Sequence, residues 1–277
     1  MPIVSVLWGL ALLTAVSLSL LWGGGMSYGL AHNSLEMAEV NAISEAGINR
    51  AVAALLEPQP ERRWRVDGSP QSFDFNGVPM KIAIQDELGK IDLNQAEPAL
   101  LASLLQSAGL DPLAGNSLAD KIVDWRTALP LKRVNGAKDE DYRAAGLPYR
   151  PRNGPFQSVG ELLLVMDMTP ALFERIAPAL TVYSGRPQFD PQLAPSEALL
   201  AMPGMTPQGA QSALASRAGV QPVADMSIGN RFTTLRGRAY TIRSEFSFKG
   251  RPIVRQTTLR LTENPYEPYW VLDWQAK

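Results

Sequence analysis

The chain has 277 residues, a formal net charge of −1, one histidine and no cysteine. This length allows one domain of moderate size, or two small ones, beyond any anchor segment. The absence of cysteine excludes a disulfide framework, thiolate chemistry and a zinc–thiolate site. Because His32 is the single histidine, a Ser-His-Asp triad in the body of the chain and a histidine-rich metal site are excluded as well.

The first 35 residues contain no Asp, Glu, Lys or Arg. Residues 3–21 are almost entirely apolar, and nineteen helical residues span about 28 Å, close to the hydrocarbon thickness of a bilayer. A cleavable signal peptide is the alternative, but it requires a basic n-region, and the chain opens Met1-Pro2-Ile3. The segment therefore predicts an uncleaved membrane helix.

Small apolar residues continue at helical spacing beyond this segment, between charged ones, until Pro58 interrupts the pattern. The pattern predicts one stalk helix within residues 1–57, about 84 Å long, with an apolar first half and an amphipathic second half. The glycines at 23–25 are its weakest point, since each costs up to about 1 kcal/mol in a helix interior. Such a helix can lie in a membrane and also pack lengthwise against other helices.

The region 58–91 has strand character. Alternating residues flank Asn76-Gly77, which is the strongest short signal for a β-hairpin. The last part of the chain, 218–277, is also strand-like. Its predicted strands are residues 231–235, 239–248, 253–261 and 270–274, with a turn at Lys249-Gly250-Arg251.

Between these regions, residues 92–217 follow a helical period. A helix is expected to start at Leu93, and Ser158 with Glu161 predicts a capping box before a short helix. The further predicted helices are residues 118–126, 162–166, 170–180, 196–201 and 207–217, with a charged loop at 127–155. The whole predicts an α+β fold in which a long N-terminal helix packs on a small antiparallel sheet that carries a large helical insertion.

Several runs together resemble the K-type minor pseudopilins of the bacterial type II secretion pathway. The matching runs are residues 6–14, 86–94, 118–126, 141–149, 153–156, 161–163 and 181–184. The resemblance implies a pilin-like body, a single-pass helix in the inner membrane, and a body in the periplasm. It also implies that the chain later joins the tip of a pseudopilus. We therefore expect an assembly protein and not an enzyme.

The resemblance further implies partners and processing. The expected partners are the I-, J- and H-type minor pseudopilins, together with a prepilin peptidase and methylation of the processed N-terminus. Contacts with partner helices are expected mainly from apolar residues of the stalk: Leu7, Leu10, Leu13, Leu35, Ala38, Ala42 and Ala46.

The start of the chain departs from the prepilin pattern, since no basic leader precedes Met1. We therefore expect either the mature form or a sequence without its true start. If Met1 is the processed N-terminus, the fifth residue is Ser5, where most pilins have Glu. A carboxylate in lipid is costly unless it is paired, and a subunit with nothing ahead of it has no amine to pair with. Ser5 therefore fits a subunit at the tip.

The densest acidic cluster is Asp139, Glu140 and Asp141, with Asp124 upstream. Relatives of this family can bind calcium through acidic residues of the body, and carboxylate oxygens suit Ca²⁺. The spacing is not that of an EF-hand, and an ordinary solvated loop is the alternative. We therefore expect no certain cofactor, with calcium as the candidate.

Three turns resemble helix-hairpin-helix motifs, at residues 107–110, 165–169 and 202–206. In DNA-binding versions, backbone amides near a turn glycine hold a phosphate. Here Asp167 takes the glycine position of the middle turn, and residues 86–185 carry 10 Lys and Arg against 13 Asp and Glu. Because phosphate binding needs the opposite charge, we expect packing motifs and no nucleic acid.

Two alternative functions remain open from the sequence. One is a membrane-anchored helix-hairpin-helix protein that binds DNA in a competence-like system. The other is a membrane-anchored hydrolase that uses carboxylates such as Asp86, Asp92, Asp120 and Asp124. No nucleophile elbow, phosphate-binding loop or dinucleotide fingerprint supports an enzyme. Asp92 is better interpreted as a helix cap, and Asp120 with Asp124 as a polar helix face.

Overall fold

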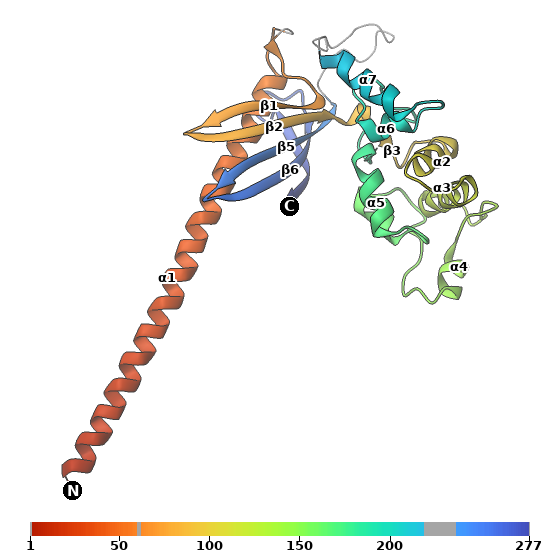
Figure 1. Ribbon diagram of the computed structural model, residues 1–277. Helices are drawn as coiled ribbons and strands as arrows, with labels where there is room; N and C mark the ends of the chain where they lie inside the picture. Colours follow the sequence, from red (N-terminus) through yellow and green to blue (C-terminus); the bar gives the residue numbers. More distant parts are fainter. Residues whose placement is uncertain (1, 60–61, 219–236, 277) are drawn as a thin grey trace.

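The computed structural model describes residues 2–59, 62–218 and 237–276, with only the course of the backbone at residues 2, 18–31, 218 and 276. Its dominant element is helix α1 (Pro2–Leu55), 54 residues long and so about 81 Å from end to end. The helix passes residues 23–25 without a break and ends three residues before Pro58, which confirms the prediction of one continuous helix. Its N-terminal part extends away from the rest of the molecule (Figure 1).

The apolar segment at residues 3–21 was expected to span a membrane. Among the helices of the described residues, none combines the length and the hydropathy needed for a membrane crossing. The C-terminal end of the predicted span falls within residues 18–31, whose side chains lie outside the described residues.

The sheet contains strands from both sides of the helical segment. Its order is β1 (Asp67–Phe75), β2 (Val78–Asp86), β5 (Ala239–Phe248), β6 (Arg251–Leu261) and β7 (Tyr269–Ala276), all antiparallel. The predicted hairpin at Asn76-Gly77 and the turn at Lys249-Gly250 are confirmed. In each turn both central residues have positive φ, between 50° and 80°, as a type I′ turn requires. The strand predicted at residues 231–235 lies outside the described residues.

The C-terminal half of α1 packs across this sheet through one apolar stripe. The helix contributes Val40, Ile43, Ile48, Ala51, Val52 and Leu55, and the strands contribute residues such as Ile82, Ile84, Tyr240 and Ile242. Gly47 lies at the closest approach, since a Cβ there would be 2.9 Å from the Met80 Cε atom. A small residue therefore allows the helix to lie close to the sheet.

The remaining elements form a second, helical body with its own buried core, seen beside the sheet in Figure 1. It contains two residue pairs in a parallel ladder, β3 (Ile91–Asp92) with β4 (Leu180–Thr181). Its helices are α2 (Pro98–Ser107), α3 (Pro112–Arg126), α4 (Asp139–Ala144), α5 (Pro170–Ile176), α6 (Ser196–Leu200) and α7 (Pro207–Ala218), with 3-10 turns η3 (Val159–Leu164) and η4 (Ala177–Ala179).

Several predicted boundaries in this body are wrong. The first helix starts at Pro98 and not at Leu93, because Asp92 and Asn94 form a tight turn in which the Asp92 carboxylate accepts the Asn94 N–H at 2.8 Å. The helix predicted to reach residue 180 ends at Ile176, because Leu180 pairs with Ile91. The charged loop at 127–155 contains a helix, α4, that the sequence analysis did not predict.

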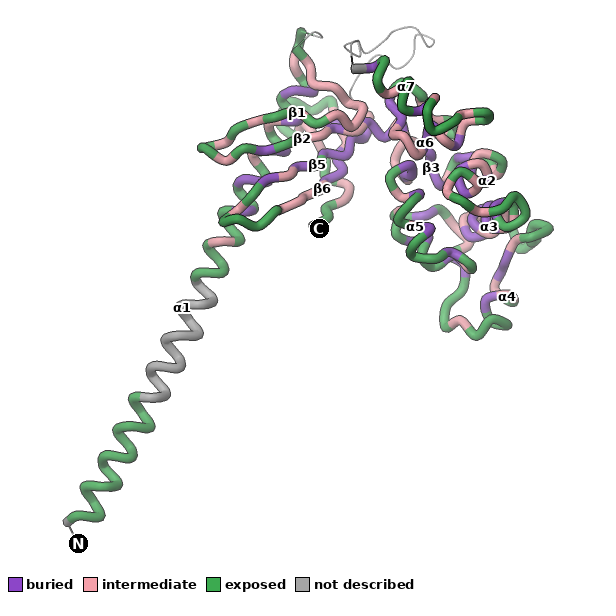
Figure 2. Tube along the Cα trace, viewed as in Figure 1, coloured by how far each residue is buried: buried purple, intermediate pink, exposed green. Residues whose placement is uncertain are grey.

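The capping box is also wrong. Ser158 makes no side-chain cap, and the segment after it is the 3-10 turn η3. Glu161 turns inward to other partners described below. The α+β fold class with a helical insertion is nevertheless confirmed. Figure 2 shows buried residues along the strands of the sheet and within the helical body, and exposed residues at the N-terminal end of α1.

Candidate interaction surfaces and the acidic loop

The stalk residues expected to contact partners lie on a face of α1 that does not pack on the sheet of the same chain. Leu7, Leu10, Leu13 and Leu35 are 58–67% exposed. Ala38 and Ala42 are also exposed, and Ala46 is half-buried. Since a helix turns about 100° per residue, Ala42 and the buried Ser44 point about 160° apart around the helix. The chain thus leaves an apolar face of α1 uncovered at these residues.

The two ends of this face differ in their surroundings. Met1 lies outside the described residues, while Ser5 is exposed near the N-terminal end of α1. Glu36 lies where the helix reaches the sheet, and its carboxylate accepts a hydrogen bond from Lys249 Nζ at 2.9 Å and lies 3.0 Å from His32 Nε2. The hydrogen bond from Lys249 holds the pKa of Glu36 below its usual value. The β5–β6 turn is therefore attached to the stalk at that point.

The three predicted helix-hairpin turns share one local pattern. Each has a residue with positive φ, namely Gly109 (100°), Asp167 (69°) and Gly204 (75°). Two positions later comes a side chain that caps the next helix, and then a proline in its first turn: Asp111 with Pro112, Thr169 with Pro170, and Thr206 with Pro207. This four-residue repeat is visible in the sequence but is not among the features predicted above.

The middle turn has an acidic residue where a phosphate would have to approach. Asp167 forms an ion pair with Lys121, whose ammonium is therefore already neutralised. A carboxylate at this position repels an anion. The turn geometry thus supports a packing role, in which αL residues and capped prolines set the angles between helices.

The acidic residues considered for calcium are only partly brought together. Asp124 is 1% exposed and so does not lie on a polar helix face as predicted. Its carboxylate accepts the Arg133 N–H at 3.1 Å, and burial raises its pKa. Asp139 and Asp141 are half-buried and Glu140 is exposed. Within the described residues, no three His, Asp or Glu side chains are grouped in a way that could hold a metal.

A cation of the chain itself lies in this loop. Lys138 is 9% exposed, and its ammonium donates to the Asp124 carbonyl at 2.6 Å, the Thr127 carbonyl at 2.6 Å and Asn153 Oδ1 at 3.0 Å. Burial lowers the pKa of Lys138, although nearby carboxylates oppose that shift. The sequence pattern predicts a charged loop around Lys138 but not the burial of its ammonium.

Glu161 takes a central place in the helical body. Its carboxylate accepts the Trp125 Nε1–H and the Gln157 N–H, both at 3.0 Å, and pairs with Arg152. Burial acts to raise the pKa of Glu161, but these donors, with Arg152 foremost, hold it below the usual value. Trp125 also stacks on Phe156 at 6.2 Å between ring centroids.

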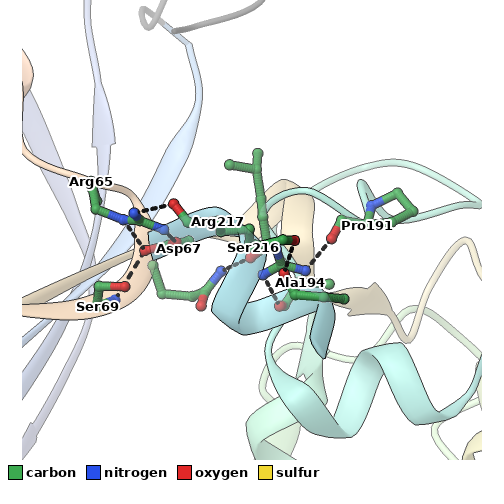
Figure 3. Close-up of polar contacts among 10 residues, drawn as sticks. Arg65, Asp67, Ser69, Pro191, Ala194, Ser216 and Arg217 are labelled. Atoms are coloured by element: carbon green, nitrogen blue, oxygen red, sulfur yellow. Dashed lines mark hydrogen bonds and ion pairs between the residues drawn. The ribbon is translucent and has the colours of Figure 1, made fainter. Parts of the chain in front are cut away.

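A polar junction joins the sheet to the helical body, and Figure 3 shows its main members. Arg65 pairs with Asp67 and donates to the Arg217 carbonyl, while the buried Arg217 guanidinium donates to the Ala194 carbonyl at 2.7 Å and to the Pro191 carbonyl. Nearby, Gln85 Nε2 donates to the Leu193 carbonyl at 2.7 Å. Side-chain donors to backbone carbonyls thus position one body against the other.

Comparisons with known proteins bear on this arrangement. A family model described as type II secretion system (T2SS), protein K, matches residues 81–185, which run from β2 to the residues just after β4. A type II secretion system protein K from Klebsiella pneumoniae is 35% identical over 79 residues. The chain resembles the K-type minor pseudopilins. The match to the Klebsiella protein spans 28% of this chain and about a quarter, 24%, of that relative.

A solved structure has a fold similar to that of this chain. It is a chain in the crystal structure of the GspK-GspI-GspJ complex from the enterotoxigenic Escherichia coli type 2 secretion system. The TM-score is 0.61 with 14% sequence identity, over 89% of this chain and 99% of that chain. This chain therefore shares its fold with a chain of that complex.

Proposed function

We propose that this chain is a minor pseudopilin that caps the tip of a type II secretion pseudopilus and helps to start its assembly for protein export. The uncovered apolar face of α1 carries the proposal. Apolar side chains exposed along a stalk, on a face that the chain does not cover itself, suit lengthwise contact with other helices. The face contains Leu7, Leu10, Leu13, Leu35, Ala38 and Ala42.

The position of the helical body supports a place at the tip. It lies beside the sheet at the end of α1 opposite to the N-terminus (Figure 1). A further subunit stacked beyond the C-terminal end of α1 would meet this body. Subunits on the side of the N-terminus could pack against the stalk. If Met1 is the processed N-terminus, Ser5 stands where most pilins have Glu and agrees with this place, because a subunit at the tip needs no carboxylate to pair with the amine of a subunit ahead of it.

The proposed partners are the I- and J-type minor pseudopilins, which are named in the complex that contains the similar chain, and the H-type by the resemblance. Before assembly the apolar segment at residues 3–21 would lie in the inner membrane, with the body in the periplasm. A prepilin peptidase would process the N-terminus before its methylation. In this role the chain has no catalytic function.

The test is co-purification of the full chain, in detergent micelles, with full-length I- and J-type partners, followed by size exclusion with light scattering. We expect a discrete complex with one copy of this chain. Ala42→Glu should abolish or strongly weaken the complex, because it places a charge in the apolar face. Asn33→Glu is the matched control, since it adds the same charge at an exposed position about 180° around the helix.

Equal loss of the complex in both variants would show that added charge, and not the apolar face, is responsible. A chain that stays alone with every partner but binds duplex DNA with a steep salt dependence would overturn the proposal. The helix-hairpin turns would then be the functional site.

A further inference from the structure

The loop between α3 and α4, residues 127–137, is held mainly by polar contacts. Its larger apolar side chains face solvent: Leu129 is 67% exposed, Leu131 83% and Val134 95%. They therefore contribute little apolar burial that could order the loop. Its order has to come from hydrogen bonds and charges at its base.

The base of the loop is a cage of oxygen atoms. The Asp124 carbonyl belongs to the last turn of α3, and Thr127 is the residue that follows that helix. Carbonyls at a helix C-terminus have few intrahelical donors and favour a cation. The Asp124 carbonyl also accepts the Thr127 N–H, at 3.3 Å. The third oxygen is Asn153 Oδ1, and its orientation is set because Asn153 Nδ2 donates to Asp139 Oδ1 at 3.0 Å.

The Lys138 ammonium lies in the centre of this cage. It has three N–H donors and three oxygen acceptors, at 2.6, 2.6 and 3.0 Å. Each proton therefore has a partner, although the side chain is only 9% exposed. A fully satisfied buried ammonium connects three chain segments that are distant in sequence, around residues 124–127, 138 and 153.

The nearby carboxylates already have other partners. Asp139 accepts from Asn153 and lies 3.7 Å from Arg150. Asp141 accepts the Lys138 backbone N–H at 2.8 Å and pairs with Lys132 at 2.7 Å. They orient the cage around the ammonium and do not converge on a common point with Asp124.

We propose that the Lys138 ammonium is the resident cation of this loop and orders it without a metal ion. Two main-chain carbonyls and an amide oxygen are also ligands that a hard cation accepts. If residue 138 carried a carboxylate, a divalent cation such as Ca²⁺ could therefore take the place of the ammonium, with the carboxylate as a further ligand.

The experiment measures thermal unfolding of the full chain in detergent micelles, with EDTA and then with calcium chloride alone. The wild-type Tm should be the same in both. Lys138→Met removes the charge at similar length and takes one donor from each of the three cage oxygens, so its Tm should fall by about 4–10 °C. Lys132→Met is the matched control, because Lys132 is an exposed lysine of the same loop, and its Tm should change by less than about 2 °C.

Two further readouts make the test specific. Hydrogen exchange of the amides at residues 127–137 should accelerate in Lys138→Met and stay unchanged in Lys132→Met. Calcium should raise the Tm of Lys138→Asp and leave that of Lys138→Met unchanged.

Any of three results would overturn the proposal. A rise of the wild-type Tm with calcium would show that a metal and not the ammonium is the cation. Equal Tm and exchange in the two methionine variants would show that the cage does not order the loop. An absence of any calcium effect on Lys138→Asp would show that the cage is not a cation site.

Discussion

The Trp125 indole donates its Nε1–H to the Glu161 carboxylate at 3.0 Å, across 36 residues of sequence. This contact joins α3 to η3, and the same carboxylate accepts the Gln157 N–H and pairs with Arg152. One buried anion therefore has donors from three places in the helical body.

Glu161→Ala should destabilise the chain by about 2–5 kcal/mol, because it leaves the donors of Trp125 and Gln157 without an acceptor in a buried place. Glu161→Gln keeps an acceptor oxygen and should cost less, about 1–3 kcal/mol. Urea unfolding followed by tryptophan fluorescence measures both. Glu174→Ala, at an exposed position of α5, is the control, and a similar loss there would contradict the assignment.

The junction between the two bodies depends on Gly89. A Cβ at this position would lie 2.2 Å from the Leu193 carbonyl oxygen, which is backbone and cannot rotate away. We expect Gly89→Ala to lower the free energy of unfolding by about 2–4 kcal/mol. At Gly160 the nearest atom is the Ser158 Oγ atom, 3.9 Å from an added Cβ. Gly160→Ala should therefore change the stability by less than about 1 kcal/mol, and equal effects of the two substitutions would refute the steric reason.

Asp86 makes stability depend on pH. It is fully buried beside Arg238, at 3.2 Å, and burial raises its pKa to about 6 against the opposing effect of that arginine. The folded state therefore binds the proton more tightly than the unfolded state. This proton binding contributes to the stability of the folded state. The contribution is complete below the unfolded pKa of 3.8 and is lost as pH rises through the folded pKa of about 6.

The expected size follows from this shift. The unfolding free energy of the wild type minus that of Asp86→Asn should fall by up to about 3 kcal/mol between pH 4 and pH 6.5. Denaturant titrations at closely spaced pH values measure the difference. Glu263→Gln, which changes an exposed acid, should show no such trend. A difference that rises with pH would mean that Arg238 outweighs burial.

Substitutions at Asp167 test the backbone conformation of the middle hairpin turn. Its φ is 69°, a region that costs a residue with a Cβ about 1 kcal/mol or more. Asp167→Gly and Asp167→Ala both remove the ion pair with Lys121, so they differ chiefly in this backbone term. We expect the glycine variant to be more stable by about 1 kcal/mol in thermal unfolding. Equal stability would argue that the turn relaxes when the carboxylate is removed.

Much of the fold could be predicted from the sequence because its signals are local. The long apolar and then amphipathic period gives α1, and Asn76-Gly77 and Lys249-Gly250 supply positive φ at both hairpin turns. The order of strand, helical and strand regions gave the α+β class with an insertion. Each of these depends on residues that are neighbours in the chain, where spacing and backbone preference act directly.

The roles of single polar residues depended on contacts between distant segments. Glu161 reads locally as part of a capping box, yet its partner is Trp125. Leu180 continues a helical pattern, yet it pairs with Ile91. Lys138 lies in a charged run, yet it is buried among oxygens from residues 124, 127 and 153.

The sequence by itself determined the stalk, the hairpins and the turns between helices, because each follows from preferences within a few residues. The tertiary structure decided which face of α1 stays uncovered, because the sheet buries the stripe through Val40, Ile43 and Ile48. It also decided that a lysine holds the acidic loop, because burial makes a polar group depend on whichever partners the fold brings within hydrogen-bonding distance.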